Sequence, residues 1–155
     1  MYDLRDLRES DADGLADVLS EIFKAGKRLT AGSKDFVHER YIHDPQRIRC
    51  TVAVDPDGRI LGFQSLKEAE KDNLYGTPVG WGVIGTHIRP SAARMGIGRK
   101  LFACSLEAAR AHGLPAIDAT IGKDNAEGLA YYEAMGFRAY RHAPGEISKV
   151  FRLDA

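Results

Sequence analysis

The chain has 155 residues, of which 44% are hydrophobic and 28% charged, and its 22 basic and 22 acidic side chains leave no formal net charge at pH 7. This length suits one domain, residues 1–155, that is large enough to bury a core of its own. The neutral balance argues against a general nucleic-acid or membrane-surface binder, and no apolar run approaches the ~20 residues of a membrane span.

The N-terminal residues and the cysteines indicate the cellular compartment in which the protein works. Residues 1–6 lack the apolar stretch of a signal peptide. Cys50 and Cys104 are the two cysteines, and their spacing matches neither a metal site nor a redox motif. We therefore expect two core thiols and a location in the reducing cytoplasm.

The first half of the chain predicts, in order, a strand over 2–7, a helix with an apolar stripe over 15–23, a second helix over 33–44, and a hairpin of strands over 49–54 and 59–66. Ser10 and Asp13 have the spacing of a capping box for the first helix. Ser33 is placed to cap the second helix. The run from Asp55 to Gly58 is a strong turn signal inside the hairpin.

The second half predicts a strand over 79–88, a helix over 96–113, a buried strand over 116–121, a helix that ends at Gly136, and a final pair of strands over 137–140 and 147–153. Asp124 with Glu127 can cap the helix that precedes Gly136. Glycines at 80, 82 and 85 weaken the first of these strands, but they permit a ligand to lie close against its backbone. The elements together predict a mixed α/β fold around a twisted sheet of about seven strands with about four helices.

A glycine loop joins the strand over 79–88 to the next helix. Pro90 ends the strand, and the loop carries Arg94, Gly96 and Gly98 into the first helical turn. Free N–H groups and the positive end of the helix dipole favour anions at such a turn, and glycine lets a ligand approach the backbone. The loop therefore predicts a pyrophosphate cradle. Gly-x-Gly alone is common in turns, and neither the third glycine of a dinucleotide fingerprint nor a Walker pattern is present.

A second motif makes the prediction more specific. Asn125 precedes by seven residues the run Tyr132-Glu-Ala-Met-Gly136-Phe137. The loop and this run together resemble the GNAT superfamily of acyl-CoA-dependent N-acyltransferases, over about residues 79–137. The sequence of residues 121–125 is most similar to that of the branch of phosphinothricin and L-amino-acid N-acetyltransferases. One departure is that the family's Gln or Arg, three residues before the first glycine, is Ala93 here, with Arg94 next.

The resemblance implies the GNAT fold, acetyl-CoA as cosubstrate, no metal, and direct attack by the amine of a small molecule such as an amino acid or an analogue. A protein N-terminus or a lysine is the alternative acceptor, and a non-catalytic acyl-CoA-binding regulatory module is the alternative of another class. A homodimer is compatible with the resemblance. The cofactor contacts that it implies are Thr86, His87, Ile88, Arg94, Met95, Gly96, Ile97, Gly98, Arg99, Asn125 and Tyr132.

Three of these residues are predicted to act in catalysis. Tyr132 matches the family's tyrosine near the CoA sulfur, and a phenol with a pKa of ~10 can protonate a thiolate; the alternative is a core aromatic. Asn125 would contact the pantetheine arm, cap a helix, or do both. The strand over 79–85 has no carboxylate, so His87, Glu68, Glu70 or a water chain is left as the base for the amine. Direct attack does not require Cys104 as a nucleophile.

Overall fold

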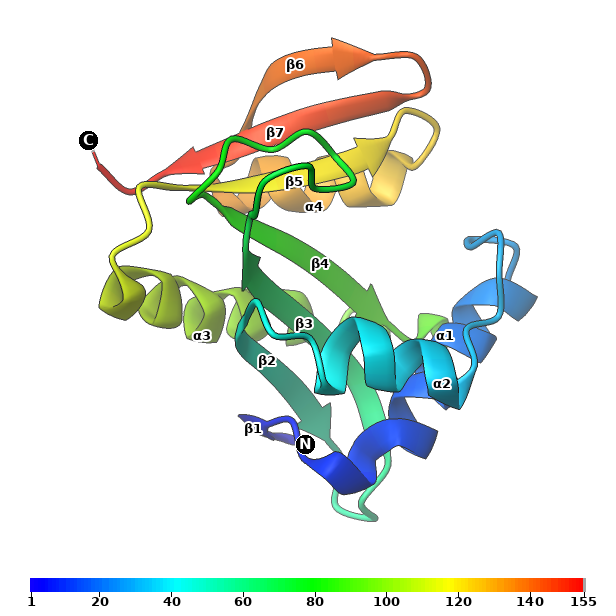
Figure 1. Cartoon of the computed structure of the whole chain (residues 1–155). Coiled ribbons are helices and arrows are strands. Elements are labelled where there is room, and N and C mark those ends of the chain that lie inside the picture. The colour runs from blue at the N-terminus through cyan, green and yellow to red at the C-terminus, as the bar shows by residue number, and fades with distance from the viewer. Residues whose placement is uncertain (155) are drawn as a thin grey trace.

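A seven-stranded sheet forms the centre of the chain (Figure 1). The structure is a computed structural model and describes residues 1–154. The sheet has the order β1-β2-β3-β4-β5-β7-β6, and only the β4–β5 pair is parallel. The strands are β1 (Asp3–Asp6), β2 (Arg47–Val54), β3 (Ile60–Glu68), β4 (Gly82–Ile88), β5 (Ala116–Gly122), β6 (Arg138–Ala143) and β7 (Glu146–Arg152).

Helices cover both faces of this sheet. They are α1 (Ala12–Lys24), α2 (Lys34–Val37), α3 (Ile97–His112) and α4 (Ala126–Met135), with a π-helical segment η2 (His38–Ile42) after α2 and two 3₁₀ turns, η1 (Glu9–Asp11) and η3 (Pro90–Ala92). These elements, among residues 1–154, confirm the predicted mixed α/β fold around a sheet of about seven strands with about four helices. Among residues 1–154 no helix is long and apolar enough to cross a membrane.

The alternation of side chains along the strands divides the core into two parts. Val52 and Phe63 are fully buried against α1 and η2 on one face of the sheet. Leu66, Ile84 and Ile117 point to the other face, where they pack with residues of α3 and α4. Neighbouring residues of one strand therefore face different helix pairs, and we call the two sides the α1/η2 face and the α3/α4 face.

The sheet opens between β4 and β5. These strands pair at only two positions, Gly82 with Ile117 and Val83 with Asp118, and then diverge (Figure 1). Beyond Val83 the edge of β4 that faces β5 has no strand partner in the part of the chain that the structure describes. Backbone groups there are free to bond a ligand, because each peptide carries a donor and an acceptor that a strand partner would otherwise occupy.

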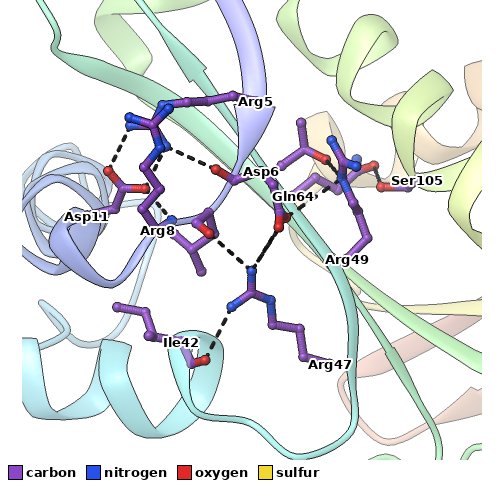
Figure 2. A network of polar contacts seen from close by, with 11 residues as sticks. Arg5, Asp6, Arg8, Asp11, Ile42, Arg47, Arg49, Gln64 and Ser105 are labelled. Carbon is purple, nitrogen blue, oxygen red and sulfur yellow. Dashed lines mark hydrogen bonds and ion pairs between the residues drawn. The ribbon is translucent and has the colours of Figure 1, made fainter.

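An N-terminal polar network fixes the position of η2 (Figure 2). Arg47 on β2 donates to the carbonyl oxygens of Ile42 at 3.3 Å and Leu7 at 3.2 Å, and it lies 3.4 Å from the carboxylate of Asp6. Arg5 forms a bidentate pair with the buried Asp11, with N···O distances of 2.8 and 2.9 Å. Burial opposes ionisation of Asp11, but Arg5 and the Arg8 amide hold the pKa of that carboxyl below its ordinary value. The network attaches η2 to β1 and β2.

Three local predictions are wrong. Ser10 lies inside η1, so α1 begins at Ala12 with Asp11 in the cap position, and no box with Asp13 forms. The cap of α4 is Asn125 and not Asp124, because the Asn125 side chain accepts from the Gly128 amide. The strand expected from residue 79 begins at Gly82, since a turn from Pro78 precedes it. The predicted Ser33 cap is confirmed, with Phe36 N–H donating to Oγ at 3.1 Å.

Candidate active site

A cavity of about 690 Å³ lies where β4 and β5 diverge, and its lining comes from both faces of the sheet. Thr86, Asn125, Tyr131 and Tyr132 line it from the α3/α4 side. Tyr41 and His87 line it from the α1/η2 side. The cavity therefore connects two surfaces that a closed sheet would separate.

A chain of buried hydrogen bonds holds Tyr132 on the α3/α4 side. The Tyr132 hydroxyl lies 2.8 Å from Thr86 Oγ1. Gln64 Nε2 donates to Thr86 Oγ1 and to the Tyr131 hydroxyl, both at 2.9 Å, and Ser105 Oγ donates to Gln64 Oε1 at 2.6 Å. Gln64 and Ser105 are both fully buried, so this network costs free energy if any member is lost.

Burial fixes the protonation state of Tyr132, against the smaller opposite effect of its hydrogen bond with Thr86. Its side chain is 6% exposed, and desolvation raises the pKa of the phenol well above its ordinary value. The hydroxyl therefore keeps its proton at neutral pH. Thr86 already accepts from Gln64, so its own proton can be donated to the Tyr132 oxygen, which leaves the phenol proton free to point into the cavity.

His87 occupies the opposite wall. Its Nε2 lies 3.2 Å from the Tyr41 hydroxyl, and its ring is 4.8 Å from that of Phe63 between centroids. Desolvation by this packing, with a smaller contribution from the positive charge of Arg28, lowers the pKa of His87 to about 3. The imidazole is therefore neutral at pH 7, and it is a weak base in this environment.

The glycine loop lies at one end of the cavity. Arg94 and Gly96 both have left-handed backbone, with φ of 68° and 75°, just before the first turn of α3. The leading amides of α3, from Ile97 to Arg99, have no acceptor within the helix. Alternating left-handed residues followed by free amides form a concave anion site. Tyr2, the residue before β1, donates its hydroxyl to Met95 O at 3.1 Å and so holds the loop against the N-terminal edge of the sheet.

The predicted cofactor residues divide into two groups. Those that line the cavity with side chain or backbone are Thr86, His87, Ile88, Arg94, Asn125 and Tyr132. Those that lie in the loop or the first turn beside it, outside its lining, are Met95, Gly96, Ile97, Gly98 and Arg99. Ile97 is 2% exposed and packs with Leu101, so only its backbone amide is available to a ligand.

Comparisons with known proteins agree with this geometry. The model of the Acetyltransferase (GNAT) family matches residues 13–137. The chain belongs to the GNAT family. This confirms the resemblance that the two motifs indicated.

Similar proteins include a curated one and many solved structures. The mycothiol acetyltransferase of Thermomonospora curvata is 34% identical over 84 residues, which are 54% of this chain and only 26% of that protein. A GCN5-related N-acetyltransferase from Kribbella flavida is 22% identical over 98% of each chain, with a TM-score of 0.77. PaiA N-acetyltransferase from Thermoplasma acidophilum, solved in complex with coenzyme A, is 16% identical over 99% of each chain, also with a TM-score of 0.77. The two structures show that the fold is shared.

Two predicted base candidates of this GNAT chain lie outside the cavity. Glu68, at the end of β3, pairs with His112 Nε2 at 2.9 Å. Glu70 is exposed in the loop after β3. Neither lines the cavity, so His87 is the predicted base candidate that does.

Several residues at the site were not predicted. In the sequence, Gln64 and Ser105 are ordinary positions of an apolar strand and of a helix. A glutamine within an apolar strand was the one signal that could have indicated a buried polar network. Asp118 on β5 is fully buried and accepts from Thr120 Oγ1 at 2.8 Å and from the Tyr140 hydroxyl. Burial raises the pKa of Asp118. Thr120 lines the cavity, and its hydrogen bond connects the Asp118 carboxyl to it.

Three side chains able to ligate a metal lie together away from the cavity. The ligand atoms of Glu9, His38 and His43 are within 4.8 Å of one another, and His43 Nε2 is 3.1 Å from Glu9 Oε1. His38 Nδ1 lies 3.9 Å from Glu9 Oε1, beyond hydrogen-bond distance, and none of the three residues lines the cavity. The expectation that the chain uses no metal remains a prediction.

Gly98 has a packing role that gives a first prediction. A Cβ atom at position 98 would lie 2.7 Å from the ring of Tyr131, whose hydroxyl donates to Gly98 O at 2.7 Å. Gly98→Ala should therefore lower the free energy of unfolding by about 1–3 kcal/mol, measured by denaturant titration. Gly122→Ala is the matched control, since no atom lies within 4 Å of its Cβ position; equal stability of the two variants would contradict the close contact.

Proposed function

We propose that the chain is an acetyl-CoA-dependent N-acetyltransferase that moves the acetyl group to the amine of a small molecule, an amino acid or an analogue, by direct attack. One observation carries this proposal. A single cavity joins a proton-donating phenol on the α3/α4 side to a neutral imidazole on the α1/η2 side, through the opening between β4 and β5. A thioester held in the opening can thus meet an amine from one face and a proton donor from the other.

The cosubstrate fits the α3/α4 side. The loop from Arg94 to Arg99 offers backbone amides and positive charge to a pyrophosphate, with Met95, Gly96, Ile97 and Gly98 contributing main chain. The unpaired edge of β4 over Thr86 to Ile88 offers donors to the pantetheine arm and to the oxyanion of the tetrahedral intermediate. One such donor is worth roughly 3 kcal/mol in the transition state.

Tyr132 is the proposed general acid. When the tetrahedral intermediate collapses, the C–S bond breaks and the sulfur leaves with its electron pair. The Tyr132 hydroxyl gives its proton to that sulfur, and the Thr86 proton stabilises the phenolate oxygen left behind. Asn125, which lines the cavity and caps α4, is proposed to contact the pantetheine arm as well.

The proton of the amine has two proposed routes. His87 can accept it directly or through water, since its imidazole is neutral, although its low pKa makes it a weak base. Thr120 can instead take the proton on Oγ1 while its own proton passes to Asp118 Oδ1. The raised pKa of that carboxyl favours its protonation during the reaction.

An ion pair between the connection after α1 and α4 favours a small acceptor over a protein segment. Lys27 and Arg28, in the connection after α1, line the cavity, and Lys27 Nζ pairs with Glu127 Oε1 on α4 at 2.6 Å. Both residues of the pair line the cavity, and we propose that an extended peptide would have to displace them to enter. A non-catalytic acyl-CoA-binding module would require no buried acid at the sulfur, and Tyr132 with its network argues against it.

The decisive experiment measures CoA release from acetyl-CoA against a panel of amines, with amino acids, simple amines and short peptides as separate arms. The proposal expects turnover with small amines and little with peptides. Faster turnover of peptide N-termini or lysines would favour the protein acceptor. Tight acetyl-CoA binding with no turnover in any arm would favour the regulatory module.

Direct attack predicts that neither cysteine is needed. Cys50 lines the cavity, but burial raises the pKa of its thiol to about 12, so no thiolate forms at neutral pH. A variant with Cys50→Ala and Cys104→Ala should retain at least about half of the wild-type kcat, because the thiol takes no part in the transition state. Trapping of an acetylated cysteine that turns over at the catalytic rate would refute this.

The compartment and the assembly remain predictions. Both cysteines are free thiols, as proteins of the reducing cytoplasm have them, and we propose that compartment on this ground. A homodimer is equally a prediction, which light scattering would test.

A further inference from the structure

The lining of the cavity carries an excess of positive charge, although the whole chain has no net charge. Seven lysine and arginine side chains line the cavity against two carboxylates. Four of the seven are paired with acidic residues: Lys27 with Glu127, Lys67 with Asp44, Arg47 with Asp6, and Arg89 with Asp17 and Glu21. Within residues 1–154, Arg28, Arg40 and Arg94 form no ion pair, so their charge is available to a ligand.

Two of these three arginines, Arg28 and Arg40, pack against the same aromatic ring in the cavity wall. The guanidinium carbons of Arg28 and Arg40 lie 5.4 and 5.0 Å from the centroid of the same ring, that of Phe36. Both side chains are half-buried, and all three residues line the cavity. Arg28 Nε donates to the carbonyl oxygen of Thr30 at 2.9 Å. Packing of a guanidinium against an aromatic ring restricts its motion, and its terminal N–H groups stay available for an oxyanion.

The pair is connected to the proposed reaction centre through aromatic contacts. The Phe36 ring meets that of Tyr41 edge-on at 6.1 Å, and the Tyr41 hydroxyl lies 3.2 Å from His87 Nε2. Arg28 and Arg40 therefore share one wall of the cavity with His87, on the α1/η2 side, while Tyr132 and the glycine loop serve the other side. The position suits the part of the acceptor molecule that is not reacting.

We propose that Arg28 and Arg40 form an anion subsite, so that the acceptor is an amine that also carries a carboxylate, phosphonate or phosphinate group. The inference rests on the proposed function and narrows its substrate class. A guanidinium group binds an oxyanion through two parallel N–H···O bonds, and each of the two arginines offers such a site on this wall of the cavity. A neutral or cationic amine would leave two half-buried positive charges unpaired in the cavity, which disfavours its binding.

The subsite also affects the candidate base. The positive charge of Arg28 contributes, after desolvation, to the low pKa of His87. An anion bound at Arg28 and Arg40 offsets that charge and makes the imidazole a better proton acceptor. An anionic acceptor would thus improve its own activation.

The test compares amines with and without the anion: alanine with alaninamide, glutamate with glutaminamide, and 2-aminoethylphosphonate with ethanolamine. Rates are compared per unit of neutral amine, because loss of the anion also lowers the pKa of the amine. The wild-type kcat/KM should be at least about tenfold higher for the better anionic members. The double variant with Arg28→Gln and Arg40→Gln should lose at least about tenfold for those members, chiefly through KM, and change less than about threefold for the neutral ones. Lys24→Gln, an exposed residue at the end of α1 outside the cavity, is the control and should change neither value.

Two results would overturn the subsite: no preference for anionic amines in the wild type, or an equal loss for both classes in the double variant. A binding measurement separates this failure from failure of the proposed function. Glutarate, which has no amine, should bind the CoA-loaded wild type in calorimetry and bind the double variant at least about tenfold more weakly. If no amine is turned over but glutarate binds in this way, the subsite stands and the proposed transfer falls; if glutarate does not bind, the subsite falls.

Discussion

Tyr132→Phe should lower the kcat of acetyl transfer by about 10²–10⁴-fold, the usual contribution of a positioned general acid. The substitution keeps the ring, which packs against Phe137 at 5.2 Å between centroids, and removes only the hydroxyl that lies 2.8 Å from Thr86. Acetyl-CoA affinity should stay within about threefold of wild type, because the phenol acts on the departing sulfur and not on the bound ground state. Stability should fall by about 1 kcal/mol for one buried hydrogen bond.

Tyr131→Phe is the matched control for this variant. Its hydroxyl has two partners, Gly98 O and Gln64 Nε2, so its removal should cost about 1–3 kcal/mol of stability and leave kcat within about tenfold. Tyr132→Phe should therefore show the larger loss of kcat, and Tyr131→Phe the larger loss of stability. This contrast separates a chemical role from a structural one. If Tyr132→Phe turns over at the wild-type rate across the pH range with chemistry limiting, water protonates the thiolate and Tyr132 is a packing residue.

The sequence was sufficient for the fold because local signals and tertiary structure agree. Glycines at 113 and 136 end α3 and α4 in left-handed conformation, as their positions after the apolar stripes indicated. The capping errors at Ser10 and Asp124 arose where a neighbouring residue competed for the same role. Asp11 is held by Arg5 on another element, and such a long-range contact cannot be seen from local spacing.

The site was predictable in part for the same reason. Asn125 and Tyr132 lie on one helix at fixed spacing, so the motif locates both. Gln64, Thr86 and Ser105 come from three elements, and only the register that sets Gln64 opposite Thr86 brings them together. The anion subsite is likewise invisible in the sequence, because an unpaired arginine is recognised only once the partners of the other cavity residues are known.

Charge reversal at the glycine loop should weaken acetyl-CoA binding by about 100-fold. Arg94 has left-handed backbone at the edge of the cavity, and Arg99 lies in the first turn of α3, where the helix dipole also favours anions. In a variant with Arg94→Glu and Arg99→Glu, two favourable contacts of ~1.5 kcal/mol or more each become repulsive toward a pyrophosphate. Calorimetry at low salt measures the effect, which should shrink as salt rises because both side chains are exposed.

Two controls make this result specific to the pyrophosphate. Arg110→Glu reverses a charge in the last turn of the same helix, outside the cavity, and should leave acetyl-CoA affinity unchanged. Acetyl-pantetheine carries the thioester and the pantetheine arm without the pyrophosphate, so its kcat/KM should be the same for the double variant and the wild type. If acetyl-CoA and acetyl-pantetheine lose affinity equally, the reversal has disturbed the fold around α3. If neither loses affinity, the pyrophosphate binds elsewhere and the left-handed residues at 94 and 96 serve only to turn the chain into the helix.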